Sequence, residues 1–436
     1  MVSSLNDIII AIAPTISDQL ITPSALAAIG TVAEQLPLTL GTTVGFECPL
    51  SQPTEADFFL RVSGAWGQSL LAGQPLTLPV LSQLHREPEL MPPGFTDLWT
   101  QTPWHHIQQL ARLWQSPQQA LQSEIEDIWL EFDINQNNAE LPVPSSFFGL
   151  KESRGNSLDW IGQQALPALL GRTLPTDTQH TLQQCLSTLS PTTPLFQVGA
   201  LSGRVSQSDD VPGLRLYIKD MTLQRIRSML QQLNWSGDLD LLTPLLSGVC
   251  HGAQSLSLQL EIHHELSPHI AVECYFGQKN DWQQVLNRLV TMGICSCDRA
   301  AALLAYPGYI RSQDNLAPFP ALLQHWSDQL APYRECLLVK RLAYLKFTYQ
   351  PGQPLNAKAY LGVSPTWVDG RYLDPVFDNS HPELLHQPED NTIQLCKALI
   401  QQLDYGEIDV DTIFPHQRSQ KSHWLNKALT LMTVGG

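Results

Sequence analysis

The sequence is short of basic residues, and this shortage limits the kinds of partner it can have. Lys and Arg total 25 against 41 Asp and Glu in 436 residues, which gives a formal charge of −16 at pH 7. We expect no binding to nucleic acid or to an anionic membrane surface, because both carry negative charge themselves. A few cations gathered in a cleft would still be enough to hold a small anionic ligand.

Several chemical motifs are also missing. There is no Walker loop, GxGxxG unit or GxSxG elbow, so nothing indicates a phosphate loop, a dinucleotide site or a serine hydrolase. No DDxxD-type acidic cluster occurs, which argues against the helical isoprenoid synthases that hold diphosphate through Mg²⁺. The adjacent pairs His105–His106 and His263–His264 diverge on a helix or a strand. We therefore predict no metal-ligand set.

The cysteines show no pairing pattern. All eight are scattered, with no CxxC pair, at positions 48, 185, 250, 274, 295, 297, 336 and 396. Cys295 and Cys297 form a CxC, but no second Cys or His pair stands at the spacing of a zinc site. This distribution is typical of buried free thiols in a reducing compartment. No secretory signal is visible, and the apolar stretch 8–14 is too short to cross a membrane, so we expect a soluble, cytoplasmic protein.

What the sequence does contain is ample material for a packed core. Hydrophobic residues make up 43% of the chain, with 11 Trp, 13 Phe and 10 Tyr. This composition excludes the disordered and fibrous classes. The length allows either two or three domains of average size or one large barrel.

Segments of alternating polarity occur in pairs, as expected for β-hairpins. The pairs are residues 42–48 with 57–63, 126–134 with 145–150, 196–204 with 213–219, 255–263 with 269–276, and 342–349 with 356–361. Helical patterns lie before and between these hairpins, at residues 5–19, 24–35, 104–115, 158–170, 179–189, 223–233, 239–249, 282–292, 299–305 and 321–330. The order therefore repeats as five helix–helix–strand–strand units.

Ten strands joined as hairpins predict an α+β fold with an antiparallel sheet. Helix pairs that follow each hairpin must cover one face, and a sheet covered on one side throughout closes most naturally into a barrel ringed by helices. An open α+β sheet, or two smaller α+β domains, are the alternatives. A TIM barrel fits poorly, because its strands are parallel and single between helices. We predict one barrel domain at residues 1–362 and a C-terminal tail at 363–436, with one helix at 393–403, that packs on the barrel.

Strand alternation also predicts which side chains face the lumen. On the strand at 213–219, for example, Leu214, Leu216 and Ile218 share one face, and Arg215, Tyr217 and Lys219 share the other. If helices cover the apolar faces, the polar sets point inward. Such a lumen must be wet or occupied, because burying ionic groups dry and unpaired costs several kcal/mol each. The alternative is an outward polar face in solvent above an ordinary apolar core.

Short motifs on these polar faces resemble one known family. They are Arg215-x-Tyr217-x-Lys219, Glu273-x-Tyr275 and Lys358-x-Tyr360, with Glu47 in GFEC and Arg61 in FFLRVS on the first hairpin. Together with the element order, they make residues 1–362 similar to the aromatic prenyltransferases of the ABBA (PT) barrel, in particular the dimethylallyltryptophan synthase branch. The resemblance implies a ten-stranded antiparallel β-barrel built from five ααββ repeats, ringed by α-helices, with a central chamber for a prenyl diphosphate.

The resemblance also implies roles for individual residues. Glu47 is the expected catalytic base, which takes up the proton of the acceptor. The expected diphosphate ligands are Arg61, Arg215, Lys219, Lys346 and Lys358, and the expected shield of the allylic cation is Tyr217, Tyr275, Tyr344 and Tyr360. Trp129, Glu131, Gln259 and Glu273 are the other residues expected in the lumen.

The expected activity is transfer of a prenyl group from an allylic diphosphate to an aromatic small molecule or a peptide side chain. The resemblance implies no required cofactor. Phe147 and Gly149 stand where the family usually has Lys-x-Tyr, and Glu131, Asp133 and Glu273 add negative charge to the lumen. Mg²⁺ or a cationic acceptor in the chamber is therefore compatible with the sequence. The alternatives are a non-catalytic barrel of this shape that binds a small molecule or a peptide, and a purely structural α+β protein.

Overall fold

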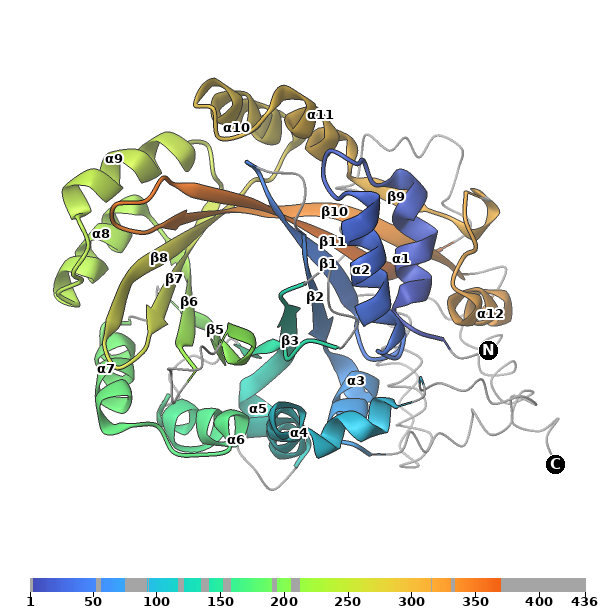
Figure 1. Ribbon diagram of the computed structural model, residues 1–436, viewed down its shortest axis with the longest axis horizontal. Coiled ribbons are helices and arrows are strands. Elements are labelled where there is room, and N and C mark those ends of the chain that lie inside the picture. The colour runs from blue at the N-terminus through green and yellow to red at the C-terminus, as the bar shows by residue number, and fades with distance from the viewer. Residues whose placement is uncertain are drawn as a thin grey trace, which may run out of the picture.

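The computed structural model describes residues 3–51, 56–74, 92, 94–116, 121–134, 141–151, 158–189, 194–204, 212–314, 316–330 and 334–369. Over these residues the chain forms a β-barrel surrounded by helices (Figure 1). The predicted helix at 393–403 and the predicted packing of the tail lie outside the described residues, as does Cys396.

The described strands form a single antiparallel sheet that closes on itself. They are β1 Thr43–Pro49, β2 Asp57–Val62, β3 Ile125–Phe132, β4 Ser145–Leu150, β5 Leu195–Ala200, β6 Leu214–Met221, β7 Ser255–Ile262, β8 Leu266–Tyr275, β9 Gly308–Ile310, β10 Arg334–Tyr349 and β11 Asn356–Asp369. Neighbours follow chain order from β1 to β8; β8 then pairs with β10, β10 with β11, and β11 with β1. The pairing of β11 with β1 closes the ring, which confirms the predicted ten-stranded barrel and excludes the open sheet.

The helices lie outside the ring of strands (Figure 1). They are α1 Asn6–Ile12, α2 Pro23–Glu34, α3 Gly64–Leu71, α4 Thr102–Gln115, α5 Leu121–Glu124, α6 Leu166–Leu170, α7 Thr176–Ser187, α8 Leu223–Gln232, α9 Leu239–Val249, α10 Lys279–Thr291, α11 Cys297–Ala305 and α12 Ala321–Leu330. Several begin at side-chain caps, such as Thr222 of α8 and Asp238 of α9, whose oxygens accept otherwise unpaired backbone N–H groups. Among the described helices, none is long and apolar enough to cross a membrane.

The main apolar core fills the space between the barrel and the helices. On β6, Leu214, Leu216 and Ile218 belong to this core, and the equivalent residues of the other strands join them. The opposite face of β6 carries Arg215 and Tyr217, and both are almost fully buried. A polar face in solvent, one of the alternatives from the sequence, is therefore wrong, because the polar face is enclosed by the barrel.

The predicted boundaries were wrong at several places. The strand predicted at 196–204 ends at Ala200, and Ser202–Arg204 form a 3₁₀ turn, η4. Strands β10 and β11 extend well beyond the predicted hairpin, and β11 runs past the domain boundary placed at residue 362. The short strand β9 on the edge of β10 and the helices α3 and α5 were not predicted.

The prediction of buried free thiols holds for most of the described cysteines. Six of them, Cys48, Cys185, Cys250, Cys274, Cys295 and Cys336, are buried and free. Cys297 is exposed, contrary to the prediction, because it begins α11 on the outer surface.

Candidate functional site

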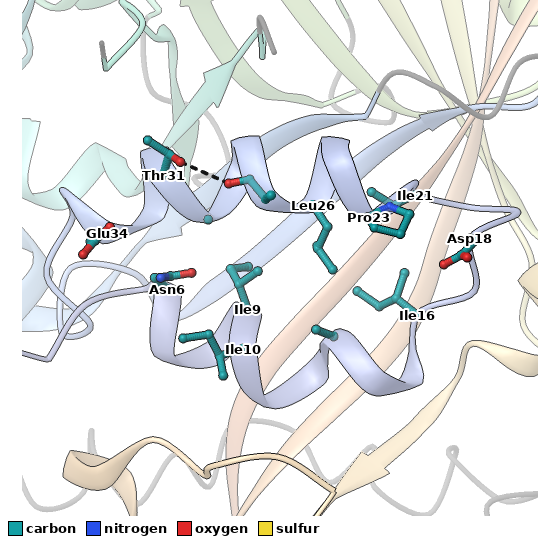
Figure 2. Close-up of a pocket in the computed structure, with 13 residues that line it drawn as sticks. Asn6, Ile9, Ile10, Ile16, Asp18, Ile21, Pro23, Leu26, Thr31 and Glu34 are labelled. Atoms are coloured by element: carbon teal, nitrogen blue, oxygen red, sulfur yellow. Dashed lines mark hydrogen bonds between the residues drawn. The ribbon is translucent and has the colours of Figure 1, made fainter. Parts of the chain in front are cut away.

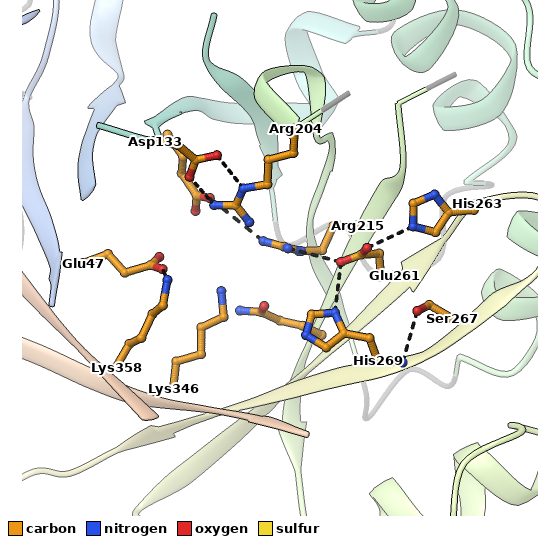
Figure 3. Close-up of polar contacts among 12 residues, drawn as sticks. Glu47, Asp133, Arg204, Arg215, Glu261, His263, Ser267, His269, Lys346 and Lys358 are labelled. Carbon is orange, nitrogen blue, oxygen red and sulfur yellow. Dashed lines mark hydrogen bonds and ion pairs between the residues drawn. The ribbon is translucent and has the colours of Figure 1, made fainter. Parts of the chain in front are cut away.

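A charged chamber of about 140 Å³ opens inside the barrel. Its polar lining is Glu47, Arg204, Arg215, Gln259, Glu261, His269, Lys346, Thr348, Asn356 and Lys358. These residues come from β1, η4, β6, β7, β8, β10 and β11, so the chamber depends on closure of the barrel. Figure 3 shows Glu47, Lys346 and Lys358 on one side, facing Arg204, Arg215 and Glu261 on the other.

Glu47 lies on the same side of the chamber as Lys346 and Lys358, and both of its carboxylate oxygens are hydrogen-bonded. Its two oxygens accept hydrogen bonds from Lys358 Nζ and from the Tyr360 hydroxyl, and only 4% of the residue is exposed. Burial by itself would raise the pKa of the Glu47 carboxyl, but the charges of Lys358 and Lys346 outweigh burial and hold this pKa well below its usual range. Glu47 is therefore ionised at neutral pH.

Lys346 is the cation with the fewest competing contacts. Its Nζ donates to the Tyr360 hydroxyl at 3.1 Å and lies 5.5 Å from the centre of the Tyr360 ring. In the described part of the chain, no carboxylate lies within ion-pair distance of Lys346. Burial lowers the pKa of Lys346, although the Glu47 charge opposes the effect. The ammonium group thus faces the chamber with no counter-ion in direct contact.

Arg215 lies on the opposite wall with one free donor. Its Nη2 donates to Glu261 Oε2 at 3.3 Å, and its Nη1 is 4.0 Å from Glu131 Oε2. Within the part of the chain that the structure describes, Nη1 has no hydrogen-bond partner, although the residue is only 4% exposed. A buried, unpaired donor of this kind is costly and is usually satisfied by a ligand or a water molecule.

Glu261 connects Arg215 to two histidines at the edge of the chamber. Its carboxylate oxygens lie 3.0 Å from His263 Nε2 and 3.4 Å from His269 Nδ1. Burial would raise the pKa of Glu261, but hydrogen bonding to His269 and the Arg215 charge hold it well below its usual range. His263 contacts Glu261 from the same strand region, and the predicted absence of a His263–His264 metal pair stays a prediction.

Arg204 is a residue of the chamber that the sequence analysis missed. Its guanidinium donates to both carboxylate oxygens of Asp133, at 2.7 Å each, and lies 4.0 Å from Glu131. We expected Arg204 at the end of a strand. Because the strand stops at Ala200 and the chain turns through η4, the side chain enters the chamber instead. The Ser-Gly-Arg sequence that follows the strand was the available signal of this turn.

Glu273 is buried across from Lys346 in the pairing of β8 with β10, but its side-chain hydrogen bonds to the described residues come from neutral donors. Gln259 Nε2 donates to its Oε1 at 2.5 Å and the Tyr275 hydroxyl donates to its Oε2 at 2.6 Å. Burial, with the residue only 1% exposed, raises the pKa of this carboxyl above its usual range. The side-chain oxygen of Gln259, Oε1, has no hydrogen-bond partner among the described residues. The Lys346 charge lowers the pKa of Glu273, but burial outweighs it.

Three of the four predicted shield tyrosines lie together. The rings of Tyr344 and Tyr360 are stacked with centroids 4.3 Å apart, and Tyr275 lies 5.1 Å from Tyr344. Phe59 extends this aromatic wall at 5.7 Å from Tyr360. Tyr217 instead packs with Phe147 and Leu201 in a separate apolar cluster.

Two predicted diphosphate ligands do not line the chamber. Arg61 Nε forms a 2.6 Å ion pair with Asp127, and its guanidinium lies over the Trp129 ring. Lys219 Nζ lies 4.5 Å from the centre of the Phe196 ring, next to a bulge at which the pairing of β6 with β7 shifts. The remaining predicted ligands, Arg215, Lys346 and Lys358, do come together.

A larger hollow of about 470 Å³ lies outside the barrel, between α1 and α2 (Figure 2). It is lined mainly by aliphatic side chains, with Asp18 and Glu34 among its few charged groups. This groove has no cluster of nucleophilic or basic groups and is not the candidate site. Among the described residues, no group of three or more His, Cys, Asp and Glu side chains is placed to hold a metal ion.

Comparisons with known proteins give structural matches alone. No protein-family model and no curated protein sequence matches the chain. The prenyltransferase PriB is 13% identical, with a TM-score of 0.46 over 82% of this chain and 94% of PriB. The 6-dimethylallyltryptophan synthase of Micromonospora olivasterospora is 10% identical, with a TM-score of 0.44 over 83% and 96%. The 5-dimethylallyltryptophan synthase of Streptomyces coelicolor is 13% identical, with a TM-score of 0.41 over 83% and 98%.

Proposed function

We propose that the chamber binds an allylic diphosphate and transfers its prenyl group to an electron-rich acceptor, either an aromatic small molecule or a peptide side chain. The observation that carries this proposal is the pair Arg215 and Lys346 on the lining of one chamber. The buried Nη1 of Arg215 lies 4.0 Å from Glu131 and has no hydrogen-bond partner among the described residues. Two cationic donors without full partners, on opposite walls of one small space, are suited to an anion with several oxygens.

The donor diphosphate would lie between these walls. Arg215 and Lys346 supply the free donors, and Lys358 and Arg204 lie on the same lining. Charge-assisted hydrogen bonds to the departing oxygens stabilise the leaving group as negative charge develops there. The prenyl chain would lie toward Tyr344 and Tyr360, whose faces attract a cation and exclude water.

The reaction needs no redox partner. The carbon–oxygen bond to the diphosphate breaks, its electron pair leaves with the diphosphate oxygen, and an allylic cation forms. The π electrons of the acceptor attack this cation and form a new carbon–carbon bond. The acceptor then loses a proton, and Glu47 is the ionised carboxylate on the lining that can receive it.

Lys346→Met tests the donor site with a matched control on the same strand. Lys340 is also on β10 and equally buried, but its Nζ lies over the Tyr306 ring outside the lumen. We expect Lys346→Met to weaken binding of dimethylallyl diphosphate by on the order of tenfold or more, the scale of one charge-assisted hydrogen bond. Lys340→Met should bind like wild type. Calorimetric titration, with and without Mg²⁺, measures the donor affinity of both variants. Equal losses of affinity in the two would contradict the proposal.

A non-catalytic barrel that binds a small molecule or a peptide is the second candidate. The observation in its favour is that Arg204 and Lys358 are already paired with Asp133 and Glu47. The two functions separate when wild type is incubated with dimethylallyl diphosphate and indole, phenol or peptide acceptors. A product heavier than the acceptor by one prenyl group, detected by mass spectrometry and absent with Glu47→Gln, supports transfer. Donor binding without any product supports the non-catalytic barrel.

A further inference from the structure

Negative charge exceeds positive charge around the chamber. The cations are Arg204, Arg215, Lys346 and Lys358, and the carboxylates on or beside the lining are Glu47, Asp57, Glu131, Asp133, Glu261 and Glu273. A diphosphate is itself multiply anionic, and repulsion between like charges is weakly screened in a buried space. Loss of the negative charge of one of these carboxylates therefore favours binding of a donor in this chamber.

Three of these carboxylates have close hydrogen-bonding partners. Glu47 accepts hydrogen bonds from Lys358 and Tyr360. Asp133 accepts two from Arg204. Glu261 contacts Arg215 and two histidines. Charge-assisted hydrogen bonds favour the ionised form, and the pKa values of Glu47 and Glu261 lie well below their usual range, so neither of these two is the group that gives up its charge.

Asp57 is differently placed. It lies on β2 directly across from Glu47 of β1 in the strand register, and the two carboxylates share one ammonium. Lys358 Nζ is hydrogen-bonded to Glu47 but lies 3.8 Å from Asp57 Oδ2. The one hydrogen bond of Asp57 to the described residues comes from the backbone N–H of Ile134, at 3.1 Å.

Lys358 interacts more closely with Glu47 than with Asp57, and the other charges that face Asp57 are negative. Glu47 faces it from β1, Lys358 from β11, and Asp133 from the chain that follows β3. Burial and the Glu47 charge raise the pKa of Asp57 to about 7, although Lys358 opposes them. Its side chain is 27% exposed, so a proton can reach it from solvent.

We propose that Asp57 takes up one proton when a diphosphate donor binds, which makes it a residue that controls donor affinity. The inference rests on the proposed function of the chamber. The anion engages Lys358 Nζ and adds negative charge, so the Asp57 carboxylate loses the support of its nearest cation. The proton comes from solvent and adds to a carboxylate oxygen, and no other bond forms or breaks.

Donor affinity should then fall as the pH rises. Above the pKa of Asp57 in the free protein, each bound donor must bring in one proton, so the dissociation constant increases about tenfold per pH unit. Below that pKa, Asp57 already carries the proton and this dependence disappears. Asp57→Asn carries no charge at any pH and should lack the dependence. The ionisation of the donor itself is common to both proteins and cancels in the comparison.

Calorimetric titration of the full chain with dimethylallyl diphosphate tests this inference. We expect Asp57→Asn to bind on the order of tenfold more tightly than wild type at about pH 8.5 and equally well at about pH 6. Titrations in two buffers of different ionisation enthalpy should show one proton fewer taken up by Asp57→Asn. The local control is Glu261→Gln, which removes a lining carboxylate whose pKa lies well below its usual range, so the number of protons taken up with the donor should match wild type.

The outcomes separate the inference from the function. If wild type binds the donor and Asp57→Asn takes up as many protons as wild type, the inference is wrong and the proposed function stands. If wild type binds no donor at either pH, the proposed function is wrong and the inference fails with it. Asp57→Ala is a second variant with the same expected loss of proton uptake, and circular dichroism checks that each variant is folded.

Discussion

Two buried glutamates of the lumen show how neighbours decide the charge of a residue. Glu47 and Glu273 are both almost fully buried, and strand alternation places both in the lumen. Lysines next to Glu47 lower the pKa of its carboxyl, whereas Glu273 has only neutral hydrogen-bond donors and its pKa is raised. Burial disfavours the charged form in both, and Lys346 lowers the pKa of both, so the difference comes mainly from Lys358, which is hydrogen-bonded to Glu47.

Glu261→Gln should destabilise the barrel. The substitution removes the carboxylate that accepts from Arg215 at 3.3 Å and contacts His263 and His269. Hydrogen bonds to charged groups contribute about 1.5–3 kcal/mol, and we expect a loss of that size in the free energy of unfolding, measured by urea denaturation at neutral pH. A variant as stable as wild type would show that Glu261 contributes nothing to the fold.

The same variant also predicts how the free energy of unfolding depends on pH. The pKa of Glu261 in the folded protein is below its ordinary value of 4.5, so its ionised form stabilises the fold at pH values above 4.5 and this stability is lost as the pH falls through the folded pKa. Gln does not titrate. The difference in free energy of unfolding between wild type and Glu261→Gln should therefore shrink between about pH 5.5 and about pH 4. A difference that grows over this range would contradict the assignment.

At the scale of the elements, glycines on the strands make room for lumenal aromatic rings. A Cβ at Gly199 of β5 would collide with the Phe147 ring and with the Ser146 carbonyl oxygen, and a Cβ at Gly45 of β1 would collide with Phe59. Neither position has a left-handed backbone, so it is close approach that requires glycine here. The sequence shows the glycines but not the rings that pack on them.

Gly199→Ala should cost about 1–3 kcal/mol, the range for forcing extra volume into a packed site. Gly362 on β11 is the matched control, because the nearest atom to its added Cβ would be a Thr43 methyl carbon at 3.9 Å, an ordinary contact. Thermal unfolding of both variants tests the pair. Equal destabilisation would mean that close approach of the Phe147 ring is not the cause.

The elements with the clearest period were predicted best. Helix α9 has the predicted bounds, and its buried residues Leu242, Leu246 and Val249 follow the helical spacing of four and three. Strand β4 also has the predicted bounds, although its sequence does not alternate. The first half of β10 was missed. There Cys336, Leu337, Leu338 and Val339 are all buried, so the segment shows no alternation, and a strand buried on both faces cannot be recognised by period two.

At the scale of the whole molecule, the contact between β1 and β11 joins segments about three hundred residues apart. We call this contact the seam of the barrel. Ala359 of β11 lies in it and pairs with Cys48 of β1 on one side and with Leu345 of β10 on the other. It is fully buried. Because the chamber takes Glu47 from β1 and Lys358 from β11, opening this seam separates the two halves of the site.

Ala359→Pro should therefore unfold the barrel or lower its free energy of unfolding by about 3 kcal/mol or more, since proline removes a ladder hydrogen bond in a central strand. Ala359→Gly is the control at the same position, because it loses the methyl group but keeps the N–H; we expect about 1 kcal/mol. Circular dichroism during urea denaturation measures both. A folded Ala359→Pro variant with wild-type stability would show that closure at this strand is not needed.

The sequence by itself determined the alternation of apolar and polar faces, and with it the closed barrel and the placing of Glu47, Arg215, Lys346 and Lys358 on its inner face. Period two is a local property that each strand carries alone. The tertiary structure decided which charges meet. It paired Arg61 with Asp127, left Lys219 beside Phe196, and brought in Arg204 and Asp57, which the sequence analysis did not select. Register, strand ends and bulges set these contacts, and they depend on the neighbouring strands rather than on any one segment.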